Sequence, residues 1–141
     1  MIAAQDLMIG DIVDVHRSEC VADGGHYMEW NEYGKVVSIT EDYITIKYNG
    51  REDDYGFEDV EEKDIEPIPL TSEILKRNGF EKVDGEYQNV FYCCDGLDLL
   101  IDDRLEPWCY TLYGVLELPI RYVHILQHAL RLAGIDKEIK L

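Results

Sequence analysis

The first half of the chain alternates apolar and polar residues with the period of two that marks β-strands. Asp42–Gly50 is the clearest case, because Ile44 and Ile46 fall on one face of the strand that it predicts. Leu7–His16 and Gly34–Thr40 show the same alternation, and a short turn at Thr40–Asp42 joins the last two of the three segments. Strands of this length joined by such turns predict a small closed β-barrel.

A short helix is expected where the first half ends, after Pro67 and Pro69. Thr71 is a favourable N-cap residue, and Asn78–Gly79 offers a left-handed helix end. Because proline cannot donate a hydrogen bond within a central strand, the two prolines close the barrel region. The pattern therefore divides the chain into two modules, residues 1–68 and 69–141.

The second module is expected to hold an antiparallel meander followed by a C-terminal helix. Turn sequences at Asp84–Gly85 and Asp95–Gly96 separate its strands, and Pro119 and Gly134 suit the start and end of the helix. One apolar stripe recurs at helical steps at Ile120, Val123, Leu126, Leu130 and Ala133. The tail Ile135–Leu141 alternates in the manner of one more short strand. The predicted fold class is α+β.

Four segments of the first module resemble the strands of SH3-like small barrels. They are "GDIV" from Gly10, "GKVVSI" from Gly34, "ITIKY" from Ile44 and "DIEPI" from Asp64. The resemblance covers about residues 5–70 and is one of pattern rather than of a diagnostic motif. It implies an SH3-like barrel, a class expected to recognise partners more often than to catalyse.

Charge is the strongest compositional signal. Thirty acidic residues against thirteen basic ones give a net charge of −17, and residues 1–70 hold eighteen of the acids and only five of the bases. A surface of this sign repels phosphates, which disfavours direct nucleic-acid binding and anionic membranes, and it steers basic proteins toward itself. The chain shows no signal-peptide pattern, so a cytoplasmic protein is expected.

The acids are densest between Glu52 and Glu66, where nine acidic residues accompany a single lysine. The pattern does not match a calcium-binding loop. Two interpretations stay open: a solvated edge that discourages strand aggregation, or an electrostatic face for a basic partner. The candidate binding residues of this face are Glu52, Asp53, Asp54, Glu58, Asp59, Glu61 and Glu62.

Cys20–Tyr33 is interpreted as an insertion loop of the barrel. Tyr27 and Trp30 within it are candidate anchors for a partner, since large aromatic side chains dominate recognition surfaces. The alternative is that both rings fold back over the end of the barrel.

Two histidines on the predicted C-terminal helix, His124 and His128, are spaced so that their rings share a face, and Gln127 lies beside them. The spacing suits two metal ligands, but Ile125 occupies the position of the glutamate in a zinc-protease motif. We expect polar or half-buried histidines rather than a metal site. We predict no catalytic residue, no cofactor, and cysteines that are reduced thiols, since no C-x-x-C pair occurs.

The chain also resembles a group of uncharacterised proteins from gut Bacteroidales and their phages and mobile elements. The matching residues are Pro67, Pro69, Leu70, Thr71, Glu73, Leu75, Asn78, Gly79 and Phe80, then Tyr122, Val123, His124, Leu126 and Gln127. The "GDIV" start matches as well. This resemblance implies a phage or mobile-element setting and no particular reaction.

Three hypotheses about function follow from these patterns. The leading one is a non-enzymatic protein-binding or adaptor module whose acidic face meets a basic or neutral surface of a protein partner. The second is an acidic mimic of DNA that blocks a DNA-binding protein. The third is a small metal-dependent enzyme using His124 and His128. The patterns predict no oligomeric state.

Overall fold

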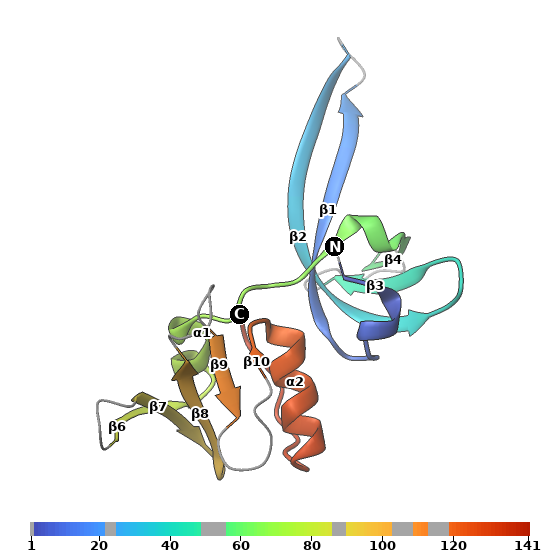
Figure 1. Ribbon diagram of the computed structural model, residues 1–141. Coiled ribbons are helices and arrows are strands. Elements are labelled where there is room, and N and C mark those ends of the chain that lie inside the picture. Colours follow the sequence, from blue (N-terminus) through green and yellow to red (C-terminus); the bar gives the residue numbers. More distant parts are fainter. Residues whose placement is uncertain (1, 22–24, 49–55, 86–89, 103–108, 113–118) are drawn as a thin grey trace. The chain divides into compact units, whose positions relative to one another are not determined.

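The computed structural model describes residues 2–21, 25–48, 56–85, 90–102, 109–112 and 119–141 (Figure 1). The chain forms two compact units, Met1–Ile68 and Pro69–Leu141. The division falls at the prolines where the sequence pattern changes. Each unit contains a five-stranded antiparallel sheet, and the two α-helices belong to the second unit, so the fold is α+β.

The sheet of the first unit has the strand order β4-β3-β2-β1-β5. The four strands that follow one another in the chain form a meander, and the fifth returns to pair with the first. Their bounds are β1 Ile12–Val21, β2 His26–Ile39, β3 Ile44–Tyr48, β4 Phe57–Val60 and β5 Ile65–Glu66. The described part of the unit also contains the 3-10 helices η1 (Ala4–Asp6) and η3 (Glu62–Asp64), the latter leading into β5.

A closed barrel, which the sequence predicted, is not what the described strands form. Among them, β4 pairs only with β3, and β5 pairs only with β1 through Asp14 and Val15. The sheet is therefore open between its two edge strands. β5 is only two residues long and runs directly into Pro67, which has no N–H to extend the pairing.

The stretch Cys20–Tyr33 was expected to be an insertion loop, and this prediction was wrong. β1 and β2 pair continuously from Ile12 opposite Lys35 to Val21 opposite His26. β2 pairs with β3 only from Gly34 onward, so the outer part of the hairpin is a two-stranded ribbon that projects beyond the sheet (Figure 1). We call this part, residues 16–21 with 26–33, the ribbon.

The core of the first unit lies on one face of its sheet. Its fully buried side chains include Val13, Val15, Val36, Ile44, Ile46, Tyr48 and Ile65. Gly34 stands among them for a steric reason, since a Cβ atom there would overlap the side chain of Ile46 and lie 3.3 Å from the ring of Tyr48. The glycine lets these two side chains pack directly against the β2 backbone.

The sheet of the second unit has the order β10-β9-β8-β7-β6. Its strands are β6 Glu81–Asp84, β7 Val90–Cys94, β8 Leu97–Asp102, β9 Cys109–Leu112 and β10 Pro119–Ile120. The predicted turn at Asp95–Gly96 is confirmed: both residues have positive φ, 52° and 83°, and Cys94 pairs with Leu97 across them. These angles suit the tight turn of a β-hairpin.

The short helix α1 (Ser72–Arg77) begins and ends as predicted. The Thr71 hydroxyl accepts a hydrogen bond from the Ile74 N–H at 3.2 Å. At the other end Gly79 is left-handed, and the N–H of Phe80 donates to the carbonyl of Leu75 at 3.0 Å. This is the Schellman arrangement of a helix end. The two residues that the hydrogen bond joins, Leu75 and Phe80, are both apolar and buried.

The C-terminal helix α2 (Val123–Leu132) starts later than predicted. Pro119 lies in β10 instead of the first helical turn, because the chain first pairs with β9. The tail Ile135–Leu141 was expected to be a strand, and it has no regular secondary structure. Its Ile139 is nevertheless buried, so the tail packs as part of the unit.

Candidate functional site

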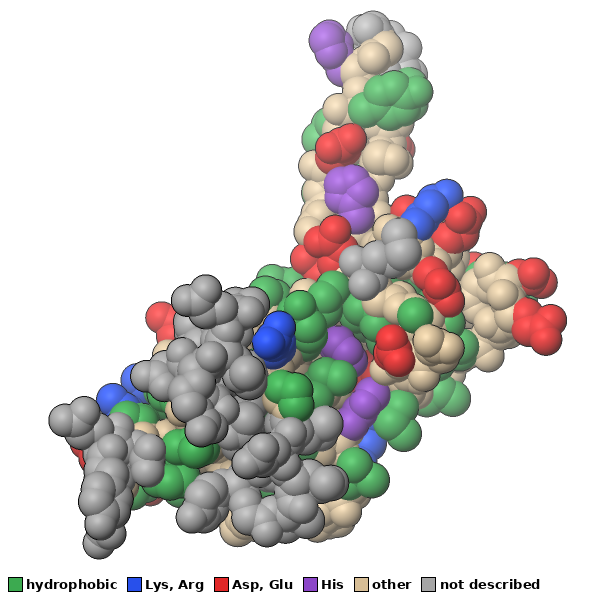
Figure 2. Space-filling view, in the orientation of Figure 1, with side chains coloured by type: hydrophobic (Ala, Val, Ile, Leu, Met, Phe, Trp, Pro, Cys, Tyr) green, Lys and Arg blue, Asp and Glu red, His purple; other side chains and the backbone are tan. Residues whose placement is uncertain are grey.

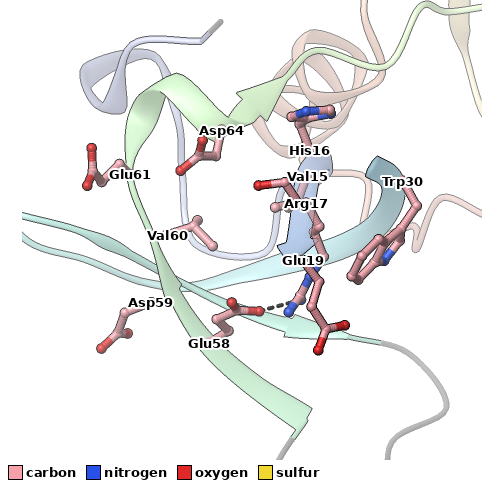
Figure 3. Close-up of a pocket in the computed structure, with 11 residues that line it drawn as sticks. Val15, His16, Arg17, Glu19, Trp30, Glu58, Asp59, Val60, Glu61 and Asp64 are labelled. Atoms are coloured by element: carbon pink, nitrogen blue, oxygen red, sulfur yellow. Dashed lines mark ion pairs between the residues drawn. The ribbon is translucent and has the colours of Figure 1, made fainter. Parts of the chain in front are cut away.

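A cavity of about 540 Å³ opens on the first unit between the inner end of the ribbon and the segment that contains β4 and η3 (Figure 3). We call it the groove. Its lining residues are Val15, His16, Arg17, Ser18, Glu19, Trp30, Glu58, Asp59, Val60, Glu61 and Asp64. Three separate stretches of the chain thus build it, and the groove is the main candidate site among the described residues.

The groove arises where the core face of β1 leaves the sheet. Val13 and Val15 point into the core, and the next residue on that face, Arg17, lies directly opposite Trp30. Since successive side chains on a strand alternate between faces, the same face carries the apolar core and then the lining of the groove. The strand itself therefore positions the charged residue beside the core.

Arg17 lies at the centre of the charge arrangement. Its guanidinium is 5.0 Å from the ring centroid of Tyr48 and 5.7 Å from that of Trp30. It forms ion pairs with Glu58 and, at 3.8 Å, with Glu32. Desolvation by burial raises the pKa of the Tyr48 phenol to about 12, and the positive charge of Arg17 opposes that rise. The guanidinium is held by two carboxylates and two aromatic faces.

The groove is acidic overall. Five acidic residues line it, Glu19, Glu58, Asp59, Glu61 and Asp64, against the single basic side chain of Arg17. Figure 2 shows acidic side chains gathered around the base of the projecting ribbon. A cavity with one sign of charge in excess concentrates ligands of the opposite sign.

Several acids of the predicted electrostatic face make contacts within their own unit. Asp59 accepts a hydrogen bond from the Thr45 hydroxyl at 2.7 Å, and Glu62 accepts one from the Ala4 N–H at 2.8 Å. Glu61 forms an exposed ion pair at 2.7 Å with Lys63, and this contact raises the pKa of the lysine. These contacts fix where the carboxylates point.

The predicted residues Glu52, Asp53 and Asp54 lie outside the described residues. The sequence analysis missed Arg17 and Glu32. One signal pointed to Arg17, since it is the only basic residue among the first thirty-four. Nothing in the sequence linked it to Glu58, because the two residues lie on strands that do not pair with each other and meet only in the folded unit.

The two predicted aromatic anchors differ in their surroundings. Trp30 is partly buried and lines the groove, whereas Tyr27 lies further out on the ribbon with 70% of its surface exposed. Met28, at 61% exposure, faces the same side as the groove-lining Trp30 two residues along β2.

The predicted residues His124, Gln127 and His128 lie on α2 in the second unit. The His124 ring is buried and stacks on Tyr122 at 5.8 Å, and the His128 ring meets it edge-on at 5.9 Å. Gln127 is buried as well. Within the part of the chain that the structure describes, no three His, Cys, Asp or Glu side chains form a group that could hold a metal ion.

Comparison with protein-family models, curated proteins and solved structures finds no match for this chain. The resemblance to Bacteroidales and phage proteins stays a prediction. In the described residues, no helix has the length and apolar character that crossing a membrane requires.

Proposed function

We propose that the first unit is a non-catalytic recognition module whose groove binds a basic segment of a protein partner. The observation that supports this most strongly is the excess of carboxylates around the partly buried Trp30 in a cavity of about 540 Å³. A lysine or arginine side chain would meet acids at the rim and an aromatic face at the wall.

The strand order supports an SH3-like classification for this unit. A four-stranded meander, a short 3-10 turn and a fifth strand that returns to β1 follow one another in the chain. A fold of this kind presents its binding residues beside its longest hairpin, where the groove lies. The adaptor role and the partner's identity rest on this proposal and on the charge of the groove.

The test uses the full chain and a fluorescein-labelled lysine-rich peptide, with a glutamate-rich peptide of the same length as the probe control. We expect saturable binding of the lysine-rich peptide by fluorescence anisotropy, weakening as salt is raised. The variant Glu19→Gln/Asp64→Asn removes two rim charges, and it should reduce affinity by roughly 3- to 10-fold.

The matched control is Asp84→Asn/Asp136→Asn, which removes two exposed acids from the second unit. If the affinity changes equally in the control and in the rim variant, the binding reflects overall charge and the proposed groove is not the site. Absence of binding by any lysine- or arginine-rich peptide at low salt would likewise contradict the proposal.

A further inference from the structure

A cysteine, a lysine and an aspartate meet in the second unit. Lys137 Nζ lies 3.0 Å from Cys94 Sγ and 3.3 Å from Asp95 Oδ2. The Cys94 thiol in turn contacts the same carboxylate oxygen at 3.4 Å. Forty-three positions separate the cysteine from the lysine, so the contact joins the β7–β8 turn to the C-terminal tail.

The tail holds Lys137 in this position on both sides. Before it, Gly134 ends α2 with φ 72°, and the Ile135 N–H donates to the Leu130 carbonyl at 2.9 Å. After it, Ile139 is buried, and the backbone of Lys140 exchanges two hydrogen bonds of 2.7 Å with the Asn78 side chain. The amine therefore reaches the sulfur from a fixed backbone.

The surroundings of the sulfur favour its oxidation. The Lys137 amine contacts Cys94 Sγ at 3.0 Å, so an oxidised sulfur there would already have a nucleophile within reach. Cys94 is partly exposed, and the contact with it is the main cause of a raised pKa at Lys137. The adjacent Cys93 differs, because desolvation by burial raises its pKa to about 11. Of the two neighbouring cysteines, Cys94 is the one whose sulfur contacts the Lys137 amine.

We propose that Cys94 and Lys137 form a peroxide-driven, thiol-reversible covalent link between Sγ and Nζ. In the first step the thiolate attacks hydrogen peroxide: an S–O bond forms, the O–O bond breaks and hydroxide leaves as water after taking a proton. Sulfur is oxidised by two electrons, and the peroxide is reduced by the same two.

In the second step the deprotonated amine attacks the sulfenic acid that has formed. The S–N bond forms, the S–O bond breaks, and hydroxide leaves with an Nζ proton as a second water. No further oxidant is needed. An added thiol reverses the link by attacking the sulfur, which releases the amine and leaves a mixed disulfide that a second thiol reduces. The link ties the tail covalently to the sheet.

The test treats the purified full chain with a small excess of hydrogen peroxide and measures its intact mass. We expect the loss of two hydrogen atoms relative to the reduced chain, restored by dithiothreitol. Proteolysis should yield one linked pair of peptides that contain residues 94 and 137, and trypsin should fail to cleave after Lys137.

Two variants separate the link from other cysteine chemistry. Lys137→Arg keeps the positive charge beside the thiol but lacks the amine, so Cys94 should proceed to sulfinic acid without any link. Cys93→Ser should form the link as the unmodified sequence does. Oxidation of Cys94 in the unmodified sequence to sulfinic acid alone, or a disulfide as its main product, would overturn the proposal.

Discussion

Asn78 connects the end of α1 to the C-terminal tail, and its side chain makes three hydrogen bonds in a buried position. The amide nitrogen donates to the carbonyl of Ile74 at 2.8 Å and to that of Lys140 at 2.7 Å, and the amide oxygen accepts from the Lys140 N–H at 2.7 Å. Only 6% of the residue is exposed. Asn78→Ala removes all three bonds at once.

The expected loss of stability follows from the number of hydrogen bonds that Asn78→Ala removes. A net contribution of about 0.5–1.5 kcal/mol for each predicts that Asn78→Ala lowers the free energy of unfolding by about 2–4 kcal/mol. Asn78→Asp is the more specific test, because it changes only the donor end of the side chain. It keeps the oxygen that accepts from Lys140 but replaces the donor with a carboxylate facing two carbonyls, so its loss should be at least as large at pH 7.

The assay combines urea unfolding with amide hydrogen exchange. We expect a lower midpoint with an unchanged slope, and faster exchange at the Lys140 N–H, since that amide loses its acceptor. Arg77→Ala serves as the control, because it changes an exposed neighbouring residue on α1. The account of the tail fails if Asn78→Ala unfolds within about 0.5 kcal/mol of the unmodified chain and exchange at Lys140 stays slow.

Three further predictions concern the first unit. Gly34→Ala should lower stability by about 1–3 kcal/mol in thermal or urea unfolding, because its methyl group would overlap Ile46, and a neutral result would contradict the packing described. Tyr48 should deprotonate with a pKa of about 12 in an absorbance titration. The stability that its neutral phenol contributes is therefore complete below about pH 10 and is lost as the pH rises to 12. The Tyr48→Phe variant should show no such loss of stability. Arg17→Met should raise the Tyr48 pKa further and lower the free energy of unfolding by about 1–2 kcal/mol, because it leaves Glu32 and Glu58 without their shared cation. An unchanged Tyr48 titration would refute the contact between Arg17 and Tyr48.

The elements predicted well from the sequence are those whose signals are local. The cap at Thr71, the glycine end of α1 and the turn at Asp95–Gly96 each depend on a few adjacent residues, and the structure has them as predicted. The ribbon was missed because its strands carry polar residues on both faces. His16 and Asn31 of the ribbon, for example, form a hydrogen-bonded row with Asp14 just before it, so no apolar alternation marks the strands.

The groove and the tail depend on contacts between distant residues, which the sequence pattern does not reveal. The acidic run was recognised from its composition, yet the pairing of Glu58 with Arg17 requires β4 and β1 to lie on the same sheet. Phe57 on β4 is apolar, yet it is 51% exposed, with Lys47 Nζ 5.5 Å from its ring centroid. On a four-residue edge strand the alternation is too short to fix which side faces the core.

The central claim is that the groove recognises a basic segment, and a residue-resolved NMR titration of the full chain with a lysine-rich peptide tests it most directly. The account predicts that amide shifts concentrate at residues 15–19, 30 and 58–64, together with the indole N–H of Trp30, and that they disappear at high salt. Shifts spread over acidic residues of both units, with no concentration at the groove, would contradict it.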